Sequence, residues 1–109
     1  MGLFTRTKKI DVATLAARLD DRQRLVIIDV REPHEWRRGR IGVSNNVPLR
    51  QLKARLSRIP LDRPVVTVCA SGHRSAAAAR ILTRAGFDAE NLSGGVRAWS
   101  RAGLPLVRR

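Results

Sequence analysis

The chain has 109 residues, 43% of them hydrophobic, which suits one compact domain with a single core and is too short for two. Its 22 Lys and Arg residues against nine Asp and Glu give a net charge of +13, which would attract anionic small molecules, acidic proteins or nucleic acid. No uncharged run approaches the roughly 20 residues needed to cross a bilayer, and the start, MGLFTRTKK, lacks an apolar signal core. We therefore expect a cytoplasmic protein that has no membrane anchor.

Two further classes of protein are disfavoured by composition. The basic residues are spread from Arg6 to Arg109, and two Trp, two Phe and no Tyr leave few rings to stack on bases, so we expect no dedicated nucleic-acid binding. Cys69 is the only cysteine, which excludes an intramolecular disulfide, and with His34 and His73 it falls short of a usual zinc ligand set. We expect neither a metal nor a cofactor.

The chain begins with two predicted segments. Residues 1–9 form a basic lead-in to a domain that we place at residues 10–107. Apolar residues at the i, i+3, i+4 and i+7 positions of residues 12–19 predict a short amphipathic helix, with Asp11 as its N-cap and two Asp residues at its end.

The next stretch alternates between strand and helix patterns. Residues 25–30, LVIIDV, are a continuous apolar run that predicts an interior parallel strand. Residues 32–38 are expected to form a short helix that begins at their proline. Val47 followed by Pro48 predicts a brief strand that the missing proline amide cuts off. Residues 49–59 carry leucine and isoleucine on one face and basic residues on the other, which predicts a helix that the following proline stops.

The central stretch joins a buried strand to a helix through a turn that opens with the cysteine. Residues 65–68 are a β-branched run that predicts a second interior strand, and Cys69 follows it directly. A helix is predicted to start near Arg74 and to end at a C-cap glycine, Gly86, with Phe87 packing back onto its last turn. The first amides of this helix have no carbonyl partner within it and point back toward the sulfur, so the turn forms an anion-binding cup.

The remaining residues complete an alternating pattern. Residues 88–92 predict another short strand, residues 93–95 a sharp glycine turn, and residues 96–102 a last helix with Trp99 on one side. Short strands alternating with helices predict an α/β domain on a mainly parallel sheet. Ligands of such sheets bind beyond the carboxyl ends of the strands, and Cys69 lies at such an end.

Three motifs connect the chain to a known family. They are Asp29-Val30-Arg31-Glu32-Pro33 with Glu35 and Trp36, Cys69-Ala70-Ser71-Gly72-His73-Arg74-Ser75, and Leu92-Ser93-Gly94-Gly95-Val96-Arg97-Ala98-Trp99. With these motifs the chain resembles a single-domain rhodanese, of the rhodanese-like sulfurtransferase family, over about residues 10–107. The resemblance implies a rhodanese-like α/β fold, with a mainly parallel central sheet of about five short strands flanked by helices.

The resemblance also implies an activity. A rhodanese cysteine takes a sulfane sulfur from thiosulfate or a persulfide donor, holds it as a persulfide, and passes it to an acceptor such as cyanide, a small thiol or a thioredoxin-like protein. One segment departs from the family pattern. Where the family usually has a Gly-His-Ile-Pro-Gly-Ala type of segment, this chain has Gly-Arg-Ile-Gly-Val-Ser at residues 39–44, followed by two Asn residues.

Cys69 is the predicted catalytic nucleophile. A lone cysteine after a valine strand is more often inert filler, but its place before a glycine turn at a helix start favours a reactive thiolate. The same amides would stabilise a persulfide and the oxyanion end of thiosulfate. The predicted substrate-binding residues are the rest of the loop: Ala70, Ser71, Gly72, His73, Arg74 and Ser75.

Several of these roles stay open at this point. Arg74 either binds the oxygens of thiosulfate or braces the loop by pairing with an acid such as Asp29 or Glu35. Ser75 either bonds a free helix amide or donates toward the sulfur. His73 is either a solvated loop residue or one that sets the acceptor preference through its partial charge.

Other polar and aromatic residues are assigned supporting roles. Asp29 and Arg31, with Glu32, are expected to form a structural ion network at a strand end, not a catalytic base. Trp36 and Trp99 are expected to pack in the core or at its rim.

Two competing functions remain. Cysteine phosphatases and arsenate reductases also use an anion cup, but those phosphatases place more residues between Cys and Arg than the four between Cys69 and Arg74, and arsenate reductases normally use a further cysteine. A noncatalytic rhodanese-fold binding module is disfavoured because such members usually lose the cysteine. We favour a monomeric sulfurtransferase of the thiosulfate type.

Overall fold

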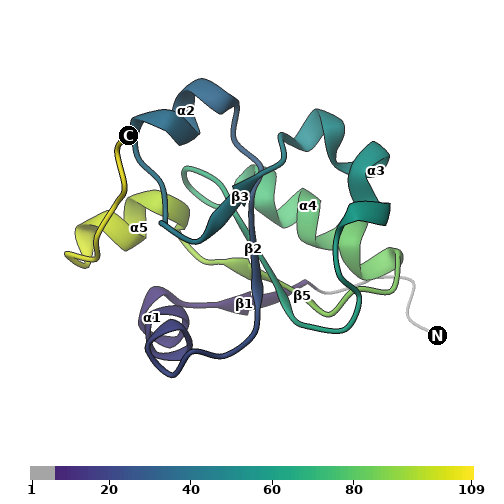
Figure 1. The fold of residues 1–109 in the computed structure, drawn as a ribbon, viewed down its shortest axis with the longest axis horizontal. Coiled ribbons are helices and arrows are strands. Elements are labelled where there is room, and N and C mark those ends of the chain that lie inside the picture. Colours follow the sequence, from purple (N-terminus) through teal and green to yellow (C-terminus); the bar gives the residue numbers. More distant parts are fainter. Residues whose placement is uncertain (1–6) are drawn as a thin grey trace.

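The structure, a computed structural model, describes residues 7–109 and contains one five-stranded sheet (Figure 1). Its strands are β1 Lys8–Ile10, β2 Val26–Asp29, β3 Ser44–Asn46, β4 Val65–Val68 and β5 Ala89–Leu92. They lie in the order β1-β5-β4-β2-β3, and every neighbouring pair is parallel. The predicted α/β architecture is confirmed, and β4, which leads to Cys69, lies at the centre of the sheet.

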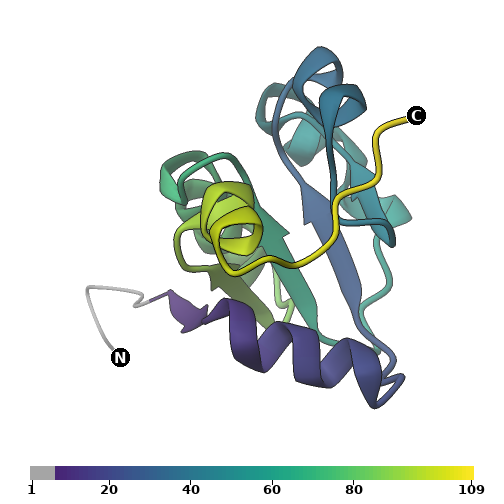
Figure 2. The ribbon, with the colours of Figure 1, turned by 90° about the vertical axis from the view of Figure 1, so that its left-hand side faces the viewer.

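Helices cover both faces of this sheet. They are α1 Val12–Asp20, α2 Pro33–Arg38, α3 Leu52–Arg55 between the 3-10 turns η1 Leu49–Gln51 and η2 Leu56–Arg58, α4 His73–Arg84, and α5 Gly95–Arg101. The helices α1 and α5 lie on one face, while α3 and α4 lie on the other (Figures 1 and 2).

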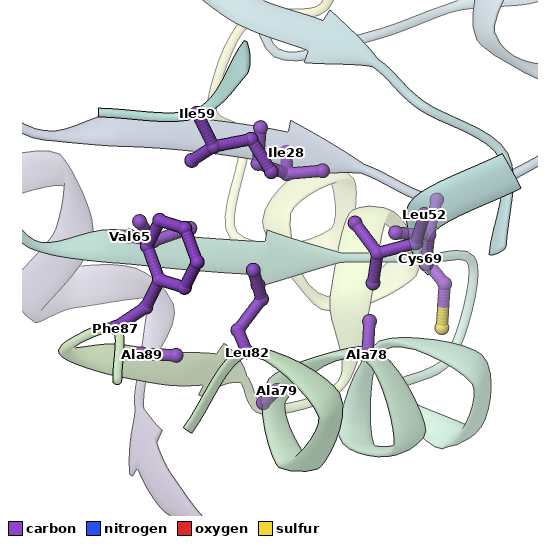
Figure 3. Close-up of a cluster of buried hydrophobic side chains, with 11 residues drawn as sticks. Ile28, Leu52, Ile59, Val65, Cys69, Ala78, Ala79, Leu82, Phe87 and Ala89 are labelled. Atoms are coloured by element: carbon purple, nitrogen blue, oxygen red, sulfur yellow. The ribbon is translucent and has the colours of Figure 1, made fainter. Parts of the chain in front are cut away.

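The alternation of side chains along the strands divides the core into two clusters. Ile28 and Val65 face α3 and α4, where they join Leu82 (Figure 3). Ile27 and Val66 point the opposite way, and join residues of α1 and α5. Each of these side chains is at most 2% exposed, and complete burial of such a residue contributes about 1.5–3 kcal/mol. The continuous apolar strands of the sequence are explained by burial on both faces.

The predicted helix caps are confirmed. Asp11 accepts a hydrogen bond from the Thr14 amide at 2.8 Å, which satisfies one free donor at the start of α1. Gly86 has φ +96° directly after α4, and Phe87 then donates its amide to the Leu82 carbonyl at 3.0 Å. The Phe87 ring is buried in the same cluster as Leu82.

Two edge strands differ from the sequence prediction. Lys8 and Lys9 are not part of a lead-in but belong to β1, where Lys8 aligns with Glu90, whereas residues 1–6 lie outside the described part of the chain. The brief strand predicted at Val47 is wrong in position, because β3 ends one residue earlier, at Asn46. Both edge strands are polar at exposed positions, so neither carries an apolar signal.

The predicted helix over residues 49–59 is only partly confirmed. Its apolar face packs on the sheet as expected, but the segment is a 3-10 turn, one short α-helix and a second 3-10 turn. The apolar residues are spaced by three, then four, then three positions, from Leu49 to Leu52, Leu56 and Ile59. This spacing matches the change from three to 3.6 residues per turn and back.

Candidate active site

Cys69 lies directly after β4 at the carboxyl edge of the sheet. It is 1% exposed, and its backbone joins the central strand to the loop that precedes α4. Figure 3 shows it at the end of the apolar cluster toward which the strand arrows point, with its sulfur directed toward the first turn of α4. The predicted position at a strand end and a helix start is confirmed, and the helix begins at His73, one residue earlier than expected.

Donors surround the sulfur of Cys69. The Gly72 amide lies 3.0 Å from Sγ and the Ser75 hydroxyl 3.2 Å from it. Burial raises the pKa of the thiol, but hydrogen bonds from the Ser75 hydroxyl and from the amides of Ser75, Gly72 and Ser71 outweigh it. The pKa of Cys69 therefore lies below its ordinary value, which favours the nucleophilic thiolate.

Gly72 gives the loop the conformation that this arrangement needs. Its φ of +111° lies in the left-handed region, which a residue with a Cβ adopts only at a cost. The turn aims the Gly72 amide back at Sγ and starts α4 at the following residue. Gly72 therefore has a conformational role in the loop.

The start of α5 holds the loop from behind. The amides of Val96 and Arg97 donate to the carbonyls of Cys69 and Ala70 at 2.9 and 3.1 Å. Gly95, at φ +61°, allows this contact, because a Cβ there would lie 2.3 Å from the Cys69 oxygen. With its first carbonyls tied to α5, the loop leaves its amides free to face the sulfur.

Asn91, on β5, belongs to the site although the sequence reasoning did not include it. Its side chain is buried, with Oδ1 at 2.5 Å from the Ser75 hydroxyl and Nδ2 donating to the Gly72 carbonyl at 3.1 Å. The Ser75 hydroxyl has a single proton, so Asn91 and the sulfur of Cys69 compete for it. In β5, whose sequence is Ala-Glu-Asn-Leu, the uncharged polar residue beside Leu92 was the available signal.

Arg74 braces the loop. Its two terminal nitrogens bind the two carboxylate oxygens of Glu35 at 2.7 and 3.0 Å, which ties α4 to α2. The hydrogen bond from Arg74 is the main reason that the pKa of Glu35 falls to about 2. Of the acids considered from sequence, the structure pairs Arg74 with Glu35, while the binding of thiosulfate by Arg74 stays a prediction.

Asp29 and Arg31 form the predicted structural ion network. The Arg31 guanidinium binds both carboxylate oxygens of Asp29 at 2.8–3.1 Å, and both side chains are buried. Arg31 also donates to the Gly39 carbonyl at 2.8 Å, and Asn46 donates to the carbonyls of both Asp29 and Arg31. These bonds fix the end of β2 beside the loop. Glu32 binds Arg50 instead.

The other predicted residues lie at the edge of the site or away from it. Ser71 and His73 are exposed, with the Ser71 hydroxyl 3.4 Å from His73 Nδ1, so the open roles of His73 stay predictions. Trp36 donates to the Ser44 hydroxyl at 3.1 Å and packs under Arg40, and buried Trp99 donates to the Pro105 carbonyl at 2.9 Å. Both tryptophans have packing roles, as predicted.

Two other structural features are absent from residues 7–109. No group of three or more His, Cys, Asp or Glu side chains in this range is arranged to hold a metal ion. None of the helices in the same range is long and apolar enough to span a membrane.

The site is a single cysteine at the end of a parallel strand with amide and hydroxyl donors around its sulfur, an arrangement that favours a thiolate in an anion cup. The rhodanese-like domain family matches residues 11–102, and the chain belongs to this family. The resemblance inferred from the three motifs is therefore confirmed.

Relatives and solved structures agree with this assignment. The chain is 40% identical over 100 residues to a sulfurtransferase of Allochromatium vinosum, covering 91% of this chain and 94% of that protein. It is 35% identical over 75 residues to the thiosulfate sulfurtransferase GlpE of Stutzerimonas stutzeri, covering 68% and 69%. A crystal structure of a rhodanese-related protein from Thermoplasma volcanium superposes with a TM-score of 0.87 at 31% identity, over 94% of this chain and 99% of the other.

Proposed function

We propose that this protein is a sulfurtransferase that moves a sulfane sulfur from thiosulfate or a persulfide donor to a thiol or cyanide acceptor through a persulfide on Cys69. The observation that carries the proposal is the sulfur of Cys69, which receives the Gly72 amide at 3.0 Å and the Ser75 hydroxyl at 3.2 Å. Membership of a family with relatives named sulfurtransferase supports it.

The chemistry follows from a thiolate and a ring of donors. The Cys69 thiolate attacks the outer sulfur of thiosulfate, the sulfur–sulfur bond breaks, and sulfite leaves with the bonding electron pair. In the second step, the acceptor attacks the terminal sulfur of the persulfide, and the electron pair of that bond returns to Sγ. Amides of the loop stabilise the negative sulfur in both states, so the same donors serve both half-reactions.

Burial of the cysteine restricts the route of the donor. Because Cys69 is 1% exposed, we expect a donor to approach its sulfur across the loop, whose outer surface is formed by Ser71 and His73. A compact anion suits this route better than a bulky substrate.

The pairing of Arg74 favours sulfur transfer over phosphate hydrolysis. A phosphatase needs an arginine that faces the bound oxyanion, whereas both terminal nitrogens of Arg74 bind Glu35. The short spacing of four residues between Cys69 and Arg74 agrees with this choice.

Thiocyanate formation from thiosulfate and cyanide tests the proposed activity. The wild-type protein should turn over, and Cys69→Ser should lose all activity because this is the only thiol of the chain. Aryl phosphate hydrolysis, measured on the same preparations, should be undetectable. The proposal would be wrong if Cys69→Ser kept its sulfur-transfer rate, or if phosphate hydrolysis dominated and depended on Cys69.

A further inference from the structure

A second hollow of the molecule lies far from the cysteine. It is a pocket of about 440 Å³ between the edge of the sheet and the segment that follows α3. Its lining includes Leu25 and Val43, the residues that directly precede β2 and β3, together with Asn45 within β3 and Val47 just after it. Cys69 lies at the carboxyl end of the parallel sheet. Figure 3 shows Ile59, from the pocket floor, at the opposite end of the apolar cluster from Cys69.

The floor and one wall of this pocket are apolar. Val26, Ile28, Val47 and Ile59 form the floor, and Val43 forms part of the rim with 64% of its surface exposed. Among residues 7–109 only Val43 and Leu61 are large hydrophobic residues that are largely exposed, and Leu61 follows the pocket residue Pro60. Apolar surface exposed around a hollow is typical of a site that binds a partner.

Arginines supply the rest of the rim. Arg55, Arg58 and Arg63 line the pocket, whereas no Asp or Glu does. Arg63 pairs with the neighbouring Asp62, but Arg55 and Arg58 have no ion-pair partner among the described residues. Guanidinium groups on a rim are suited to carboxylates, which they bind through two parallel hydrogen bonds.

We propose that this groove, formed by the pocket and its arginine rim, binds an acidic segment of another protein. One apolar side chain of the partner enters the pocket against Ile28 and Ile59, and flanking carboxylates pair with Arg55 and Arg58. The positive charge of the rim favours a negatively charged partner, and the apolar floor binds the side chain that anchors this partner. The groove is separate from Cys69, so the partner and a sulfur donor bind at the same time.

The same features disfavour other occupants. Residues 1–6 of the chain contain no carboxylate side chain, and a second copy would bring together two molecules that each carry a net charge of +13. A single-stranded nucleic acid is disfavoured because no aromatic residue lines the pocket to stack on a base.

Binding of a designed probe tests the proposal. The probe is a fluorescently labelled peptide with glutamates on both sides of a single leucine, and its affinity is measured by anisotropy at physiological salt. Arg55→Glu combined with Arg58→Glu should weaken binding about tenfold or more. The matched control, Arg97→Glu combined with Arg101→Glu, changes the net charge equally on α5, which covers the opposite face of the sheet from α3, and should weaken binding far less. Circular dichroism and the alkylation rate of Cys69 verify that each variant is folded.

Four outcomes would overturn the proposal. Equal loss in the two charge-reversal variants would mean general attraction to a basic protein. Undiminished binding of a peptide with serine in place of leucine would show that binding needs no apolar anchor. NMR chemical-shift changes at Gly72 and Arg74, instead of Val43 and Arg58, would show that the peptide binds at the cysteine end of the sheet. Tighter binding of phosphatidylserine vesicles or of an oligonucleotide, lost in the same Arg55 and Arg58 variant, would assign the groove to a different class of partner.

Discussion

At the scale of single residues, the reactivity of Cys69 depends on a balance between burial and hydrogen bonding. Burial alone would keep the sulfur protonated, and the Ser75 hydroxyl is the first of the donors that reverse this effect, followed by the loop amides. Arg74, the nearest guanidinium in sequence, is occupied by Glu35. The thiolate is therefore stabilised mainly by the loop itself and by one serine.

This balance predicts different effects for two loop variants. Alkylation of wild-type Cys69 by iodoacetamide should have its midpoint below the value of about 8.5 of an unperturbed thiol. Ser75→Ala should move the midpoint upward and slow alkylation at pH 7 several-fold, because the sulfur loses a direct donor. Arg74→Ala should move the midpoint less. A wild-type midpoint at or above 8.5, or a larger effect of Arg74→Ala, would contradict this assignment.

The Glu35–Arg74 ion pair predicts a pH-dependent contribution to stability. The pKa of Glu35 is lowered from 4.5 to about 2 in the folded protein, so the pair stabilises the fold above pH 4.5 and loses this effect as the pH falls toward 2. Glu35→Gln should reduce the free energy of unfolding by about 1 kcal/mol at pH 7.

Urea unfolding across this pH range provides the measurement. The gap between wild type and Glu35→Gln should narrow as the pH falls from 5 toward 2, since the protonated wild-type side chain then resembles glutamine. Other carboxylates titrate in both proteins and cancel in the comparison. A gap that stayed constant with pH would show that the ion pair is not its source.

At the scale of elements, the active loop is positioned by three segments that are distant in sequence. The strand β4 delivers Cys69, α4 supplies the amides, and the start of α5 binds the carbonyls of Cys69 and Ala70. The motifs at residues 69–75 and 92–99 therefore contact each other directly in the fold. Gly95 is its tightest point, because its backbone lies directly against the loop.

Two glycines with similar backbone angles test this contact. Gly95 has φ +61° and a Cβ there would lie 2.3 Å from the Cys69 oxygen, whereas Gly103 has φ +78° and nothing within 4 Å of a Cβ. Gly103→Ala should cost about 1–2 kcal/mol of unfolding free energy from backbone conformation alone. Gly95→Ala should cost more than about 3 kcal/mol and alter the reactivity of Cys69. Similar losses in the two variants, measured by thermal unfolding, would rule out the close contact.

At the scale of the whole molecule, local patterns predicted the parts that carry their own signal. The strands β2 and β4 are buried on both faces and α4 has a clear apolar stripe, so each was visible in the sequence. The edge strands β1 and β3 were missed or misplaced because their residues are mostly polar.

The site was predicted to a similar degree. Cys69 and its loop follow from the central stretch and the family resemblance, since the residues are consecutive in the chain. Asn91 and the choice of Glu35 as the partner of Arg74 depend on which elements pack side by side. A local pattern contains no such information.

The charge of the molecule supports both proposals. Among residues 7–109, six of the nine carboxylate side chains form ion pairs, and most of the Lys and Arg residues in this range have no acidic partner. The resulting positive field attracts anionic sulfur donors and acidic proteins alike. In the two proposals, local geometry then separates them, because amide and hydroxyl donors face the sulfur of Cys69 while the groove near Arg58 has an apolar floor.

The intact mass of the protein tests sulfur transfer through Cys69 most directly. Reduced protein incubated with thiosulfate should gain one sulfur, about 32 Da, and cyanide or dithiothreitol should remove it. Cys69→Ser should gain nothing under the same conditions. A gain that persisted in Cys69→Ser, or no gain in a wild-type protein whose thiol was reduced at the start, would contradict a persulfide on Cys69.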